Sequence, residues 1–143
     1  MHLLDINALI ALCDQDHEHH EKTQRWFRRE RDYGWSTCPI TENGTLRILA
    51  QPSYPNALKS VDEAAVVLRN LIAAAPRHEF WPDRISILDR AIIPGFAKAR
   101  PPMLADLYLL ALTVERDACF ATLNTRIDPN LVPGGGEALV TIS

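Results

Sequence analysis

The sequence predicts a three-layer α/β fold, in which a mostly parallel sheet lies between two layers of helices. Short apolar runs that suit buried strands alternate with longer segments of helical periodicity along the 143 residues. With 47% hydrophobic and 23% charged residues, the composition is that of an ordinary globular protein. We therefore expect residues 1–143 to form one domain.

The first element is a short strand that leads to an acidic residue. Leu3 and Leu4 precede Asp5, and residues 8–12 suit a helix with Asn7 as its N-cap. Open parallel sheets bind ligands at the carboxyl ends of their strands, which is where this reading places Asp5. The alternative is that Asp5 only occupies a turn.

The remaining elements follow from the same patterns. Helices are predicted at 21–31, 39–49, 60–75, 85–93 and 103–117, and strands at 35–38, 78–81, 118–122 and 138–142. Residues 133–136 carry three glycines but lack the strand–helix context of a phosphate-binding loop, so we expect an ordinary loop there. Gly44 falls inside a predicted helix at a cost of about 1 kcal/mol relative to Ala, which indicates close packing.

Three more polar residues come just after predicted strands or begin a helix. Glu42 lies in the first turn of the helix that follows strand 35–38, and Asn124 follows strand 118–122. Asp106 is the one charge in the first turns of the most apolar helix, where a buried carboxylate needs a partner. The topology of a parallel sheet places these residues and Asp5 near one edge.

Such a cluster of oxygen donors predicts a metal site. Two carboxylates ~4 Å apart repel by about 4 kcal/mol at an effective dielectric of 20, and a bound cation offsets that cost. Oxygen ligands without nearby Cys or His select Mg²⁺ or Mn²⁺, which can hydrolyse phosphodiesters by activating water. A second candidate, the group His17, His19 and His20, is interpreted as a solvated surface at a helix start.

Charge and cysteine content bear on partners and compartment. The net charge of −3 argues mildly against a nucleic-acid partner, but twelve arginines against three lysines favour contact with phosphates. Cys13, Cys38 and Cys119 are interpreted as buried free thiols in a reducing compartment. Residues 1–5 lack the features of a signal peptide, and no apolar run is long enough for a membrane span. We expect a cytoplasmic protein with no membrane partner.

Four segments, in this order, resemble the PIN-domain ribonucleases, and most closely the VapC-type toxins of bacterial toxin–antitoxin pairs. They are LLDINALIAL, TCPITENGTLRIL, ADLYLLAL and CFATLNTRI, and the resemblance covers essentially the whole chain. It implies a PIN-like α/β/α fold in which Asp5, Glu42 and Asp106 form the acidic metal site. It also implies that Asn7 and Thr122 support this site.

The chain departs from the family at the fourth acid. Where the family commonly has a T-F-D pattern after the last core strand, this chain has Thr122, Leu123 and Asn124. Asn124 can still offer a neutral oxygen to a metal ion, although the site loses a charge. Asp128 is a possible substitute ligand if residues 124–128 are helical.

The resemblance implies a Mg²⁺- or Mn²⁺-dependent endoribonuclease, the toxin of a type II toxin–antitoxin system, that cleaves structured RNA (tRNA or rRNA) and so inhibits translation and growth. It further implies a homodimer with a shared RNA groove, a VapB-like antitoxin that blocks this groove, and operator DNA bound only through the antitoxin complex. Two alternatives remain. One is a catalytically weak or inactive PIN-like RNA-binding module. The other is a haloacid-dehalogenase-type phosphohydrolase, which normally has a second Asp at the position of Asn7.

Overall fold

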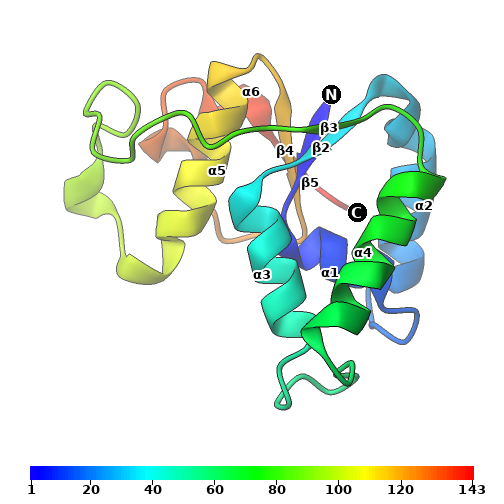
Figure 1. Cartoon of the computed structure of the whole chain (residues 1–143). Coiled ribbons are helices and arrows are strands. Elements are labelled where there is room, and N and C mark those ends of the chain that lie inside the picture. The colour runs from blue at the N-terminus through cyan, green and yellow to red at the C-terminus, as the bar shows by residue number, and fades with distance from the viewer.

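Five short parallel strands form the centre of the structure, a computed structural model that describes residues 1–143 (Figure 1). They are β1 (His2–Leu4), β2 (Trp35–Thr37), β3 (His78–Phe80), β4 (Cys119–Thr122) and β5 (Leu139–Thr141). Their order across the sheet is β3-β2-β1-β4-β5, and every neighbouring pair is parallel. The direction of strand succession therefore reverses between β1 and β4. At such a switch point, the loops after the two strands diverge and leave a crevice.

Helices cover both faces of this sheet, as the sequence predicted. They are α1 (Ile6–Cys13), α2 (His20–Glu30), α3 (Pro39–Leu49), α4 (Val61–Ala74), α5 (Leu104–Glu115) and the one-turn α6 (Gly135–Ala138). In Figure 1, α5 and α6 lie on one side of the sheet, and α1, α2 and α4 lie on the other. The three-layer α/β/α architecture is thereby confirmed.

The two faces of the sheet bury different side chains. Leu3 of β1 and Phe120 of β4 pack with residues of α5, such as Leu107, in one core. Leu4 and Ala121, the next residues along each strand, belong to the other core with α1, α2 and α4. This alternation is the two-residue period of a strand that is covered on both faces.

Gly44 allows α1 and α3 to approach closely. A Cβ atom at this position would lie 2.3 Å from Cδ1 of Ile6, the first residue of α1. The interpretation that this glycine marks close packing is therefore confirmed. The contact holds the first turn of α3, which carries Glu42, against the helix that follows β1.

Two segments differ from their prediction. Residues 85–93 form turns instead of a helix, because Ser86 Oγ accepts from the backbone N–H of Leu88 and Asp89 Oδ1 accepts from that of Ala91. Such local bonds compete with the helical ladder. Residues 133–136 are not wholly a loop, since Gly135 begins α6.

The three cysteines are free thiols. Cys38 is buried, but Cys13 and Cys119 are only partly buried, so the prediction of burial holds fully for Cys38 alone. Burial raises the pKa of the Cys38 thiol to about 11 and that of Cys13 to about 12. Both thiols therefore stay protonated near neutral pH and make poor nucleophiles.

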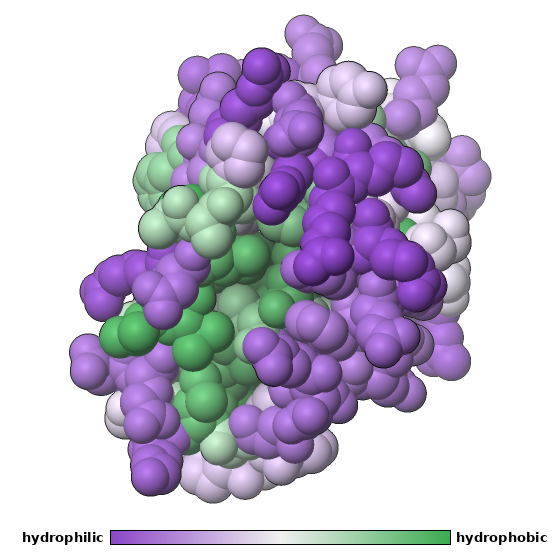
Figure 2. Space-filling view, turned by 90° about the vertical axis from the view of Figure 1, so that its right-hand side faces the viewer, coloured by the Kyte–Doolittle hydropathy of each residue, from purple (hydrophilic) through white to green (hydrophobic).

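Figure 2 shows the side of the molecule on which α2 and α4 lie, with apolar side chains gathered between polar ones. Val61 and Val66 of α4 are among the exposed apolar residues. Leu46 of α3 and Leu68 and Ile72 of α4 line a hollow between these two helices. No helix of the structure combines the length and the apolar character needed to cross a bilayer.

Candidate active site

Asp5 lies at the switch point of the sheet and is almost completely buried, with 4% of its surface exposed. Its Oδ1 accepts from the backbone N–H of Ile6 at 2.7 Å. Its Oδ2 accepts from the hydroxyl of Thr122 at 2.5 Å and from the amide of Asn7 at 2.9 Å. Thr122 is the last residue of β4, so these bonds join the ends of β1 and β4, the two strands at the switch point. The alternative that Asp5 only occupies a turn does not hold.

Asn7 is a supporting residue of this cluster and not the N-cap of α1. The helix begins two residues earlier than expected, at Ile6, and the carboxylate of Asp5 caps it. The side chain of Asn7 is thereby free to bridge the strand ends. Its Nδ2 donates to Thr122 Oγ1 at 3.0 Å, and its Oδ1 accepts from the backbone N–H of Leu123 at 3.0 Å.

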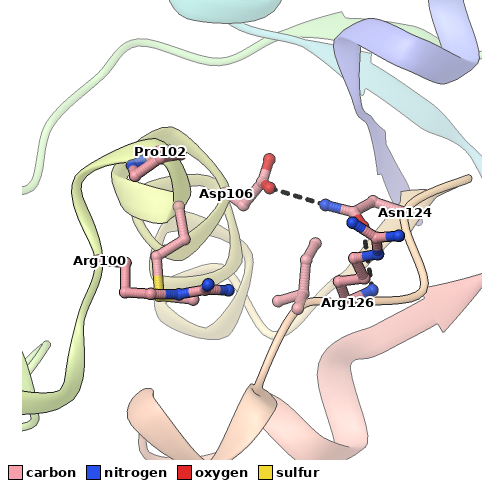
Figure 3. A pocket seen from close by; sticks show the side chains of 7 residues that line it. Arg100, Pro102, Asp106, Asn124 and Arg126 are labelled. Atoms are coloured by element: carbon pink, nitrogen blue, oxygen red, sulfur yellow. Dashed lines mark hydrogen bonds between the residues drawn. The ribbon is translucent and has the colours of Figure 1, made fainter.

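Asp106 reaches this region from the first turn of α5 on the opposite face of the sheet. Its Oδ2 accepts from Nδ2 of Asn124, in the loop after β4, at 3.1 Å (Figure 3). The backbone N–H of Asn124 donates in turn to Thr122 Oγ1 at 3.0 Å. Thr122 and Asn124 therefore connect the carboxylates of Asp5 and Asp106.

The orientation of the Asn124 amide follows from a second bond. Its Oδ1 accepts from the backbone N–H of Arg126 at 2.9 Å. A backbone N–H can only donate, so the amide oxygen faces the loop and the NH₂ group faces Asp106. The expectation that Asn124 offers an oxygen to a metal ion is not met in this arrangement. Asn124 instead gives Asp106 a neutral donor.

Glu42 is held one strand away from the Asp5–Asp106 pair. Its Oε1 accepts from the hydroxyl of Thr37, the last residue of β2, at 2.7 Å. The same hydroxyl oxygen lies 2.8 Å from Nε2 of His78 in β3. A hydroxyl has one proton, which Thr37 gives to Glu42, so Nε2 of His78 must be the donor in the second bond. Thr37 and His78 thus fix the direction of Glu42.

No hydrogen bond joins Glu42 to Asp5 or Asp106, and no group of three His, Cys, Asp or Glu side chains is close enough to hold a metal ion. The structure therefore brings Asp5, Asp106, Asn124 and Thr122 together but leaves Glu42 beside them. Sequence reasoning missed Thr37 and His78. Thr37 could have been found, because it lies next to the last residue of the predicted strand 35–38, at the same edge of the sheet.

Asp128 does not take the place of the fourth acid. Residues 124–128 are not helical, so the condition for this substitution fails. Its Oδ1 accepts from the backbone N–H of Asn130 at 3.0 Å and caps the short 3-10 helix Pro129–Leu131.

The histidines of the second candidate metal site make local contacts. The ring of His20 bonds to the carbonyl of Ala11 at 2.7 Å, and Nδ1 of His17 accepts from the backbone N–H of His19 at 3.0 Å. These bonds fix the turn between α1 and α2.

Comparison with curated proteins decides the family. The chain is 41% identical to ribonuclease VapC44 of Mycobacterium tuberculosis over 135 residues, which is 92% of each protein. The chain belongs to the VapC ribonuclease family. It is also 32% identical to VapC38 over 130 residues (89% of this chain, 87% of the relative) and 30% identical to VapC39 over 137 residues (96% and 98%), both from the same organism.

A solved structure agrees with the VapC fold. The crystal structure of VapC20 from M. tuberculosis, a sarcin–ricin loop cleaving toxin, superposes with a TM-score of 0.61 at 12% identity. The match covers 94% of this chain and 95% of the VapC20 chain. At 12% identity it supports the fold alone. A scan against models of protein families finds no match.

The acidic pair of this VapC chain is electrostatically strained. Burial, together with the charge of Asp106, raises the pKa of Asp5 to about 6, although the hydrogen bond from Thr122 opposes this rise. Burial likewise raises the pKa of Asp106, which the bond from Asn124 partly offsets. A positive charge between the two carboxylates would relieve both costs.

The donor atoms fit a hard divalent cation. Both groups offer carboxylate oxygens, and Mg²⁺ is commonly held by one or two carboxylates while it keeps several waters. No cysteine sulfur belongs to this cluster, so the softer ligands that favour zinc are missing. Asp5 and Asp106 are the residues that would hold such an ion.

We expect the buried Asp5 to destabilise the metal-free protein as the pH rises. The folded state keeps this proton to about pH 6, whereas the unfolded chain releases it near 3.8, so the folded state binds more protons between these values. This contribution to the free energy of unfolding is therefore lost as pH rises through that window, by on the order of 3 kcal/mol.

Denaturant titrations in a chelating buffer from pH 4 to 7 test this expectation. The free energy of unfolding of Asp5→Asn, minus that of the parent, should increase as the pH rises. For Asp62→Asn, an exposed substitution, this difference should not change with pH. If the difference in stability between Asp5→Asn and the parent does not change with pH, the raised pKa of Asp5 is contradicted.

Proposed function

We propose that this VapC chain is a metal-dependent endoribonuclease that cleaves structured RNA, tRNA or rRNA, as the toxin of a type II toxin–antitoxin system. The observation that carries the proposal is the buried Asp5 carboxylate, held beside Asp106 at the switch point of the sheet. The two acidic groups offer carboxylate oxygens to a cation, and the named relatives are ribonucleases. Cleavage by such an enzyme would inhibit translation and growth.

Each site residue has a proposed role. Asp5 and Asp106 would hold Mg²⁺ or Mn²⁺, and Glu42 would complete the acidic set from the first turn of α3, where its carboxylate accepts from Thr37. Asn7 and Thr122 position Asp5 through their hydrogen bonds. The chemistry that the ion supplies is activation of water and neutralisation of the charge that develops on the phosphodiester.

The proposed partners follow from the family and from the surface. A VapB-like antitoxin would block the RNA groove, and a homodimer would bring two acidic sites to it. Apolar side chains exposed on the side of α2 and α4 (Figure 2) support a protein partner, since such patches mark interaction surfaces. Operator DNA would be bound only through the antitoxin complex. The three free thiols suit the cytoplasm, where RNA is available.

A weakly active PIN-like RNA-binding module is the second candidate. It is favoured by the Asn124 amide, which presents NH₂ to Asp106 where a metal ion would need oxygen. The membership in the VapC family removes the haloacid-dehalogenase alternative.

Cleavage assays with tRNA and rRNA separate the two candidates. Asp5→Asn or Asp106→Asn should lower Mn²⁺-dependent cleavage by more than about hundredfold, and Asn7→Ala by about 10–100-fold, as expected for a residue that orients a ligand. Asp62→Asn, an exposed substitution on α4, is the control. Full activity of either Asp variant would exclude the proposed site, and cleavage by none of the proteins would favour the RNA-binding module.

Asn124→Asp should lower the stability of the protein in chelator and raise its affinity for metal ions. In chelator, it replaces a donor to Asp106 with a second negative charge, and the protein should lose on the order of 1–4 kcal/mol of stability. With Mn²⁺, the sign should reverse, and less metal should be needed for cleavage. The turn at residue 126 should persist, because an Asp oxygen can also accept from Arg126.

Melting temperature and cleavage rate, each titrated with Mn²⁺, measure both effects. Asp128→Ala is the matched control and should leave the metal dependence nearly unchanged. A shift of both curves by Asp128→Ala, with none from Asn124→Asp, would contradict the placement of position 124 beside the ion.

A further inference from the structure

Two arginines line the pocket in front of Asp106. The pocket has a volume of about 380 Å³, and its lining includes Arg100, Asp106, Asn124 and Arg126. Figure 3 shows Arg100 reaching in from the side of α5, while Arg126 stands beside Asn124 on the other side. The pocket therefore has a cation on each wall and the Asp106–Asn124 hydrogen bond between them.

Neither arginine has an anionic partner within the chain. The arginines that pair with carboxylates are Arg29, with Glu30, and Arg84, with Glu115. Arg100 and Arg126 are both exposed, and no hydrogen bond from either guanidinium to a protein acceptor is present. The lining thus carries two positive charges and one negative charge on a protein whose net charge is −3. This local excess of positive charge sits at the edge of the acidic site.

The backbone on both walls is fixed relative to Asp106. Arg100 precedes Pro101 and Pro102, which restrict it to an extended conformation and lead through a 3-10 helix directly into α5. On the other wall, the backbone N–H of Arg126 is bound by the oxygen of the same Asn124 amide whose nitrogen binds Asp106. Both arginines are therefore placed by short connections to the carboxylate.

We propose that Arg100 and Arg126 form a phosphate clamp, which binds the RNA backbone next to the scissile phosphodiester on the Asp106 side. This inference rests on the proposed ribonuclease function. An acidic site repels an approaching polyanion, and free guanidinium groups beside it offset that repulsion. Arginine binds phosphate oxygens with a planar pair of donors. Such contacts fix the position of the strand without reading its sequence.

Equilibrium binding of RNA tests the clamp. In an Asp5→Asn background, which blocks cleavage and leaves the pocket lining intact, a short oligouridylate and a structured hairpin RNA serve as probes. Arg100→Gln and Arg126→Gln should each weaken binding of both probes about tenfold. The slope of log K against log salt should fall by about 0.7 for the single strand with each lost contact. Arg84→Gln removes the same charge from an arginine already paired with Glu115, and should change neither quantity.

Kinetics distinguish the clamp from a merely structural role. In the active protein, loss of a contact made equally in the ground and transition states should raise KM and leave kcat unchanged. Arg100→Lys and Arg126→Lys keep the charge without the planar fork, and should recover part of the affinity.

The clamp and the ribonuclease function can fail separately. Metal-dependent cleavage by the parent, together with unchanged affinity and salt slope in both Gln variants, would overturn the clamp alone. Weaker binding by the Gln variants, together with full cleavage by Asp106→Asn, would support the clamp and overturn the catalytic site. If the parent binds neither RNA, both proposals are overturned.

Discussion

The burial of one carboxylate, Asp5, constrains the whole carboxyl edge of the sheet. A buried charge needs hydrogen-bond donors, and Asp5 accepts from Ile6, Asn7 and Thr122, which follow β1 or end β4. These bonds start α1, fix the end of β4 and set the position of the loop that follows. The remaining cost appears in the raised pKa of Asp5, which a cation shared with Asp106 would relieve. The same group therefore organises the fold and prepares the site.

Around this group, neutral polar side chains hold the other acids in place. Asn124 satisfies Asp106 and the backbone of Arg126 with the two ends of one amide, so it connects α5 to the loop after β4. Thr37 binds both Glu42 and His78 of β3 through its hydroxyl group. Hydrogen bonds from neutral side chains thus offset part of the cost of placing these carboxylates at one edge of the sheet.

The sequence was most informative where the backbone alone decides the position of a residue. Asp5, Asp106 and Asn124 follow strands or begin a helix, and the parallel topology brings them to one edge. It was less informative where side chains compete for partners. Asp5, and not Asn7, is the N-cap of α1. Residues 85–93 form turns instead of the predicted helix, because Ser86 and Asp89 accept from nearby backbone N–H groups. The position of Thr37 near a strand end could be predicted, but its hydrogen bond to Glu42 could not.

Anomalous diffraction from crystals grown with Mn²⁺ tests the central claim most directly, because it locates the ion without depending on activity. We expect a peak that contacts carboxylate oxygens of both Asp5 and Asp106, because burial and the charge of Asp106 raise the pKa of Asp5. The peak should be lost in Asp106→Asn and retained in Asp128→Ala. A Mn²⁺ peak that contacts neither Asp5 nor Asp106, or no peak at saturating metal, would contradict the account.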